Sequence, residues 1–115
     1  MQELRIQPDH PQALYEAADV LYTNGKLQEA EQYLLRTVKF EPNMAEAHFA
    51  LARIYTATGR YSQSVAELKE TMVLTPDDPD PHYRMAVVLR KMGKPDQAQR
   101  ELEIFVTLRS KMSSN

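Results

Sequence analysis

Hydrophobic side chains follow one another along the chain at steps of three and four residues, in short runs separated by glycine or proline. Two of these runs are Leu14, Ala17, Ala18 and Leu21, and then Leu27, Ala30, Leu34 and Val38. Steps of three and four place side chains on one face of an α-helix. The pattern predicts first helices near 12–24, 45–58 and 80–92, and second helices near 28–41, 62–74 and 96–110.

The pattern repeats every 34 residues. All three glycines of the chain, Gly25, Gly59 and Gly93, are separated by this step. Prolines, alanines, leucines and aromatic residues recur in the same register: Pro8, Pro42 and Pro76; Ala18, Ala52 and Ala86; Leu34, Leu68 and Leu102; Tyr15, Phe49 and Tyr83. We therefore divide the chain into units at 11–44, 45–78 and 79–112, with 1–10 as the end of a preceding unit of a longer array.

Glycine and proline mark the ends and starts of the helices because of their backbone properties. Each glycine lies where a helix is expected to end, since glycine adopts the left-handed conformation without a Cβ clash. Pro42 and Pro76 lack the amide hydrogen that a continuing helix needs, whereas Pro95 suits the first turn of a helix. Aspartate side chains can cap the third unit's first helix. The candidates are Asp77, Asp78 and Asp80.

A 34-residue helix pair with these markers resembles the tetratricopeptide repeat family. The middle unit carries the resemblance best, through Leu51, Ala52, Tyr55, Gly59, Tyr61, Leu68 and Pro76. The resemblance implies an all-α fold, a right-handed superhelical stack of helix–turn–helix repeats (an alpha–alpha superhelix). It also implies a scaffold for protein–protein interaction, which binds a peptide or a partner helix in a concave groove lined by the first helices.

The resemblance places eight candidate partner-binding residues on or near that groove. They are Tyr15, Asp19, Phe49, Arg53, Tyr83, Arg84, Arg90 and Lys91. The three aromatic residues offer large, rigid contact area, although aromatic residues at this position can also simply pack against their neighbours. The arginines could hold carboxylates of an acidic or C-terminal segment. The alternative is a solvated surface of mixed charge.

The last predicted helix has a broad apolar surface. Its apolar side chains cover an arc of roughly 200°, whereas a helix that packs on one side needs only about 100°. The expected self-association edge consists of Ile104, Phe105, Leu108 and Met112. Two alternatives to groove binding thus stay open: a self-assembly module that associates through its terminal helices, and an accessory domain of a larger enzyme.

Composition and charge narrow the chemistry. The chain has 115 residues, a net charge of −2 and no cysteine, so it provides neither a basic field for nucleic acid nor thiolate chemistry. No apolar run approaches the roughly 20 residues that span a bilayer, and the N-terminus lacks a signal-peptide pattern. We expect a soluble protein, with a cytoplasmic location favoured over others, and no contact with a membrane or nucleic acid.

Catalytic motifs and cofactor motifs are not apparent, so we expect neither an enzyme nor a cofactor. His48 and His82 occupy equivalent positions one repeat apart and could be considered as metal ligands. Neighbouring repeats stack about 10 Å apart, which is too far for two side chains to share one ion. We interpret both histidines as packing residues between helices.

Overall fold

The computed structural model describes residues 10–114, which form six α-helices. Their bounds are α1 Pro11–Thr23, α2 Leu27–Phe40, α3 Ala45–Ala57, α4 Tyr61–Leu74, α5 Asp80–Lys91 and α6 Pro95–Ser113. The predicted helices are therefore confirmed to within about one residue, except that α6 extends three residues beyond the expected end at 110. Each predicted unit contains one helix pair. The expected remnant of a preceding unit, at 1–10, lies outside the described residues apart from His10.

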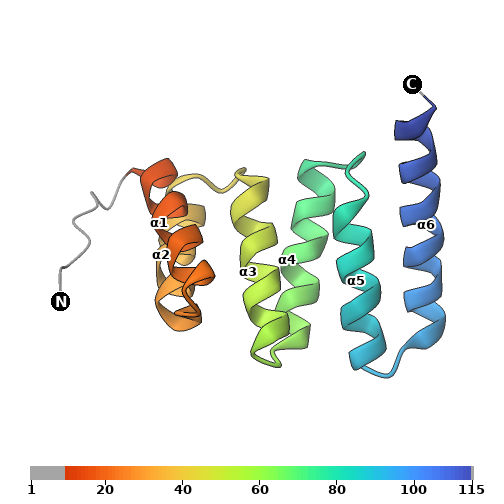
Figure 1. The fold of residues 1–115 in the computed structure, drawn as a ribbon, viewed down its shortest axis with the longest axis horizontal. Helices are drawn as coiled ribbons and strands as arrows, with labels where there is room; N and C mark the ends of the chain where they lie inside the picture. Colours follow the sequence, from red (N-terminus) through yellow and green to blue (C-terminus); the bar gives the residue numbers. More distant parts are fainter. Residues whose placement is uncertain (1–9, 115) are drawn as a thin grey trace.

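The helix pairs follow one another in a row along the long axis of the molecule, and each helix runs opposite to the one before it (Figure 1). The main packing joins helices that are adjacent in sequence, with a smaller contact between α3 and α5. The molecule is elongated, with extents of 45 × 34 × 22 Å. This arrangement is the predicted all-α stack of helix–turn–helix repeats. Within residues 10–114, no helix is both long and apolar enough to span a bilayer.

Burial takes place between neighbouring repeats, in two clusters of side chains. The first joins repeats 1 and 2 through Ala18, Leu21, Ala30, Leu34, Ala47, Leu51, Ile54 and Tyr55. The second joins repeats 2 and 3 through Ala52, Leu68, Met85, Ala86, Val88, Leu89 and Ala98. Helix α3 belongs to both clusters, since its consecutive residues Leu51 and Ala52 face different ones. The core is thus distributed along the row.

Each first helix ends two residues before a glycine in the left-handed conformation. The φ angles of Gly25, Gly59 and Gly93 are 78°, 77° and 77°. The residue after each glycine donates its amide to a carbonyl five residues earlier, as in Arg60 N to Tyr55 O at 2.8 Å. This bond satisfies a carbonyl that the end of the helix would otherwise leave free. The predicted role of the glycines is confirmed.

The prolines and one of the capping aspartates also lie at the ends of helices, as the sequence predicts. Helices α2 and α4 end two residues before Pro42 and Pro76, and α6 begins at Pro95. Of the three aspartates considered as caps, Asp78 accepts a hydrogen bond from the amide of Asp80, with 3.0 Å from N to Oδ1. A side-chain acceptor thus binds one of the free amides at the start of α5.

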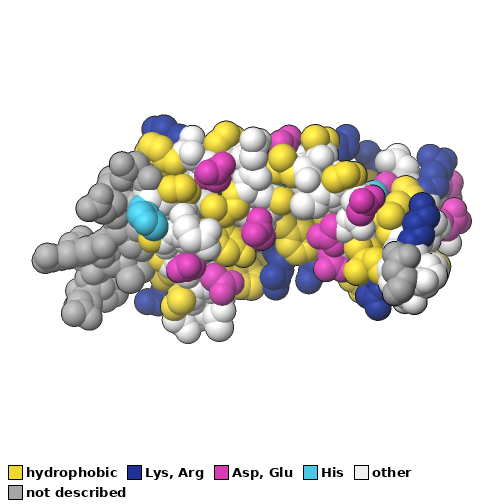
Figure 2. All heavy atoms as spheres, turned by 90° about the horizontal axis from the view of Figure 1, so that it is seen from above, with side chains coloured by type: hydrophobic (Ala, Val, Ile, Leu, Met, Phe, Trp, Pro, Cys, Tyr) yellow, Lys and Arg dark blue, Asp and Glu magenta, His cyan; other side chains and the backbone are white. Residues whose placement is uncertain are grey.

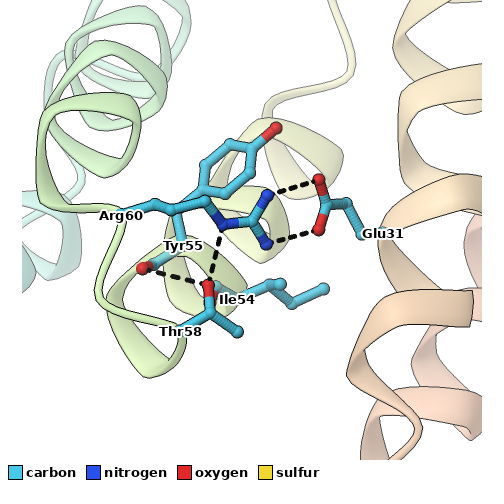
Figure 3. A network of polar contacts seen from close by, with 5 residues as sticks. All are labelled: Glu31, Ile54, Tyr55, Thr58 and Arg60. Atoms are coloured by element: carbon cyan, nitrogen blue, oxygen red, sulfur yellow. Dashed lines mark hydrogen bonds and ion pairs between the residues drawn. The ribbon is translucent and has the colours of Figure 1, made fainter.

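An ion pair between Arg60 and Glu31 joins the first two repeats (Figure 3). Arg60, in the turn before α4, donates from Nη1 to Glu31 Oε2 of α2 at 2.8 Å, and Nη2 donates to Oε1. Its guanidinium lies 4.7 Å from the centre of the Tyr55 ring, and Nε donates to Thr58 Oγ1. The hydrogen bond to Glu31 raises the pKa of Arg60 above its usual value. One repeat later the equivalent residues are Val65 and Lys94, so this pair is not repeated.

Candidate functional site

A groove of 420 Å³ runs across the first helices of repeats 1 and 2 and reaches the start of repeat 3. Helices α1 and α3 supply most of its lining, and Leu34 of α2, the end of α4 and the segment up to the first residue of α5 complete it. The lining residues are Tyr15, Ala18, Asp19, Tyr22, Leu34, Ala45, Glu46, Phe49, Ala50, Arg53, Thr71, Thr75, Asp78 and Asp80. Four of the eight candidate partner-binding residues, Tyr15, Asp19, Phe49 and Arg53, are therefore brought together here.

Aromatic and small side chains form the apolar part of the groove. Tyr15 of α1 and Phe49 of α3 occupy equivalent positions one repeat apart, and both are half-buried. Tyr22 lies two turns after Tyr15 on the same helix and is also half-buried. Ala18 and Ala50 leave room beside these rings because they have only a methyl group. The result is a rigid apolar surface that stays open to a ligand from one side.

Arg53 provides the single basic group of the groove lining. Its guanidinium lies over the ring of Tyr22, with 4.8 Å between Cζ and the ring centre. Its Nε is buried and has no hydrogen-bond partner within residues 10–114. A buried donor without an acceptor costs free energy, about 1–3 kcal/mol for a typical group. The guanidinium is therefore positioned by the aromatic ring rather than by a carboxylate.

Four carboxylates line the same groove: Asp19, Glu46, Asp78 and Asp80. The pKa of Tyr15 reflects the charges of two of them. Burial raises this pKa above 10.0, the negative charges of Asp19 and Glu46 raise it further, and Arg53 lowers it. Burial is the largest of these causes, and the two carboxylates act in the same direction because a negative environment disfavours the tyrosinate.

Asp19 is among the eight residues that the sequence places on or near the groove, whereas Asp78 is predicted only as a capping residue and Glu46 is not singled out. Asp80 is predicted as a capping residue and, through the family resemblance, as a residue that would repel a bound carboxylate. A signal for two of them was present, because Glu46 and Asp80 each precede an aromatic position, Phe49 or Tyr83, by three residues. A spacing of three places them on the same helix face as those aromatic residues.

The remaining candidates, Tyr83, Arg84, Arg90 and Lys91, lie on α5 and are not part of the lining of the 420 Å³ groove. Tyr83 is 46% exposed, and its ring packs against Phe105 of α6 with 5.4 Å between ring centres. Arg90 and Lys91 are exposed in the last turn of α5. The structure thus divides the predicted set into a groove group from α1 and α3 and a separate group on α5.

The outer face of α6 carries the predicted self-association edge. Ile104 is 40% and Met112 59% exposed, whereas Phe105 and Leu108 are half-buried. Val106, which the predicted edge did not include, is 59% exposed. Two shallow depressions of 440 and 640 Å³ follow this helix, the first beside Ile104 and Leu108 and the second beside Phe105 and Val106.

The two histidines considered as metal ligands form equivalent hydrogen bonds to glutamates within their own repeats. His48 Nδ1 lies 2.7 Å from Glu67 Oε1, and His82 Nδ1 lies 2.7 Å from Glu101 Oε1. The second ring nitrogen of His48 lies 2.7 Å from the carbonyl oxygen of Pro42. Each pair joins the two helices of one repeat. Among residues 10–114, no group of three or more His, Cys, Asp or Glu side chains is arranged to hold a metal ion.

Several solved structures share the fold of this chain. A crystal structure of MamA superimposes with a TM-score of 0.91 at 16% sequence identity, covering 95% of this chain and 64% of that one. MamA 41-end from Desulfovibrio magneticus RS-1 gives a TM-score of 0.86 at 18% identity, with coverages of 91% and 59%. A chain of the CopN–Scc3 complex gives a TM-score of 0.82 at 21% identity, with coverages of 90% and 61%.

At these identities the likeness concerns the fold alone, and the chain spans less than two thirds of the length of each of these three structures. No curated protein matches the sequence. Family models match consecutive stretches of it. Models described as tetratricopeptide repeat match residues 11–54 and 82–109, and a model described as TPR repeat matches residues 52–93. Since these matches join without a gap over 11–109 and the fold agrees with them, the chain belongs to the tetratricopeptide repeat family.

Proposed function

We propose that this chain is a protein-interaction scaffold that holds a segment of a partner protein in the groove formed by α1 and α3. One observation carries the proposal: the groove exposes an organised set of aromatic rings and a stacked arginine that forms no hydrogen bond within residues 10–114. Aromatic and arginine side chains are enriched among the residues that contribute most to protein–protein binding. Repeat arrays of this kind generally use their concave surface for binding.

The rings are suited to binding because their own fold already holds them in place. Tyr15 and Tyr22 pack against the first core cluster, and Tyr22 supports the guanidinium of Arg53. A preorganised side chain loses little conformational entropy when a partner binds. A partner segment that covers Tyr15 and Phe49 would therefore gain apolar contact without a large ordering cost.

Partner capture tests this proposal. The double variant Tyr15→Ala/Phe49→Ala should lose the partners that the unmodified chain captures from a cell extract, as measured by quantitative mass spectrometry. Val73→Ala is the matched control, because Val73 is 74% exposed on α4 and does not line the groove. Circular dichroism should show that both variants stay helical. Capture of the same partners in the same amounts by the folded double variant would refute groove binding.

A second candidate function is self-assembly through the outer face of α6, and a comparison among the repeats favours it. Thr37 of α2 and Thr71 of α4 are 0% and 2% exposed. The equivalent residue of α6 is Phe105, which is only half-buried, and the nearby Val106 is 59% exposed. Helix α6 thus presents apolar surface at the positions that α2 and α4 bury against the following helix.

Sedimentation over a concentration series tests the second candidate. If copies associate through this face, the unmodified chain should form dimers or larger species, and Val106→Glu should return it to a monomer. Val73→Glu is the control, because Val73 is also exposed but lies on another helix. A monomer at the highest concentration measured, or association that Val106→Glu does not change, would refute this candidate.

A further inference from the structure

The charge of the groove lining is strongly unbalanced. Four carboxylates (Asp19, Glu46, Asp78 and Asp80) and one guanidinium (Arg53) leave a net charge of −3 on its walls. The chain as a whole has a net charge of only −2, with 14 basic and 16 acidic residues. Viewed from the side on which α3 and α5 begin, carboxylates occur along the middle of the molecule among hydrophobic side chains (Figure 2). Lysine and arginine lie mostly around its rim (Figure 2).

Helix stability explains some of these carboxylates. Glu46 and Asp80 lie in the first turns of α3 and α5, where the helix dipole favours a negative charge. Asp78 accepts the amide of Asp80. Such roles would be present in any helix of this type, so these three residues alone do not indicate a ligand.

Asp19 has no comparable role in the fold. It lies in the second half of α1, where the helix dipole disfavours a negative charge. Its side chain is exposed and forms no ion pair with another residue between 10 and 114. Asp19 follows Tyr15 by one helical turn, so its carboxylate lies beside the aromatic part of the groove.

Arg53 does not neutralise this group of carboxylates. Its guanidinium lies over Tyr22, and no carboxylate of the described chain lies within ion-pair distance of it. The guanidinium lines the groove and donates no hydrogen bond to another residue between 10 and 114, so its donors are left for an acceptor on a ligand. A polypeptide supplies such an acceptor at every residue through its backbone carbonyl. The arginine therefore fits a bound chain of any side-chain charge, and the carboxylates around it select which charge.

We infer that the segment bound in this groove carries lysine or arginine next to apolar side chains. The inference rests on the proposed function and specifies its ligand. The apolar side chains lie on Tyr15 and Phe49, the cationic groups face Asp19 and Glu46, and a backbone carbonyl accepts from Arg53. An acidic segment, considered from the sequence, fits poorly. Arg84, Arg90 and Lys91 lie outside the groove, and the carboxylates inside it would repel the segment.

Three labelled synthetic peptides of equal length test this inference. In one, lysine alternates with leucine, and in the other two glutamate or glutamine replaces every lysine. Fluorescence anisotropy should give the tightest binding for the lysine peptide and the weakest for the glutamate peptide. Two unit charges about 4 Å apart in water interact by about 1 kcal/mol, which is about fivefold in affinity. The preference for lysine should shrink as salt shortens the screening length from about 10 Å at 0.1 M to about 3 Å at 1 M.

Single variants of the lining residues test whether the preference for the lysine peptide arises in the groove. Asp19→Asn and Glu46→Gln should each weaken binding of the lysine peptide by up to about fivefold at low salt, and leave the glutamine peptide unaffected. Glu16→Gln is the matched control, because Glu16 is exposed on the same helix as Asp19 but does not line the groove. It should change binding by much less than Asp19→Asn.

The outcomes separate this inference from the proposal on which it rests. If the glutamate peptide binds more tightly and Tyr15→Ala/Phe49→Ala abolishes that binding, the groove is a binding site, but the inference that it prefers a basic segment is refuted. If the lysine peptide binds and the double variant does not weaken its binding, both the groove as binding site and the basic segment as its ligand are refuted. If none of the three peptides binds, the inference of a basic ligand is refuted. If the chain forms dimers and Asp19→Asn dissociates them, the occupant of the groove is a second copy of this chain, and the inference is refuted as well.

Discussion

Three single variants, each with one equivalent leucine replaced by alanine, would measure how much burial in each repeat contributes to the stability of the fold. Leu34, Leu68 and Leu102 are equivalent residues of α2, α4 and α6. Leu34 and Leu68 are 1% and 0% exposed, because helices of two repeats enclose them, whereas Leu102 is only partly buried against the second core cluster. The same substitution therefore removes the same atoms from two fully buried sites and from one partly buried site.

The expected magnitudes follow from that burial. Replacing a fully buried leucine by alanine costs about 2–5 kcal/mol, the sum of lost transfer free energy and the cavity left behind. We expect about 3 kcal/mol for Leu34→Ala and for Leu68→Ala. Leu102→Ala should cost about half as much, because part of its side chain already contacts solvent and the cavity opens to water. Since a small domain is stable by only about 5–15 kcal/mol, either internal variant should be visibly destabilised.

Urea unfolding followed by far-ultraviolet circular dichroism measures these differences as shifts of the midpoint at constant slope. The experiment is done at low micromolar concentration, so that association through α6 does not protect Leu102. Equal losses for Leu68→Ala and Leu102→Ala would refute the reasoning. That result would mean that the outer side of α6 is covered in solution, or that burial does not follow the boundaries between repeats.

Three further predictions concern the turns and the groove. Arg60→Ala should lower the thermal midpoint by removing the ion pair with Glu31, more at low than at high salt, whereas Lys94→Ala at the equivalent position should not. Gly59→Ala should cost about 1–2 kcal/mol in urea unfolding, purely from its φ of 77°, because nothing lies within 4 Å of the added Cβ. Gly59→Asn should cost less, and a neutral Gly59→Ala would contradict this reading. Burial and two carboxylates raise the pKa of Tyr15, so stability from this group is full below pH 10.0 and is lost as pH rises through the raised value. Ultraviolet titration, with Tyr15→Phe to identify the signal, should show this pKa fall in Asp19→Asn; an unchanged value would contradict the effect of the charge.

The repeat and its helices could be predicted from the sequence because their causes are local. Helical spacing, a glycine that must adopt a positive φ and a proline that cannot donate are properties of short segments, and each recurs at a step of 34 residues. The helix bounds were therefore correct to about one residue except at the end of α6, where no glycine or proline marks the stop.

The candidate site was only partly predictable. Tyr15, Asp19, Phe49 and Arg53 were expected near the groove and lie in its lining, whereas the α5 residues lie elsewhere. The packing of Tyr83 on Phe105 depends on a bulky side chain in α6 at the position where α2 and α4 carry threonine. The contact joins two different helices, α5 and α6, so it could not be inferred from the spacing of residues within either helix.

Sequence alone determined the length of the repeat, the order of the helices and the residues that end them, since hydrogen bonding and backbone conformation act over a few residues. Tertiary structure decided that Glu46, Asp78 and Asp80 join Asp19 around one groove. It also decided that Arg53 lies on Tyr22, with no carboxylate partner among the residues that the structure describes. Those distances depend on how far each repeat is displaced and rotated against the next. The packed side chains of two repeats set that displacement together, and no single segment encodes it.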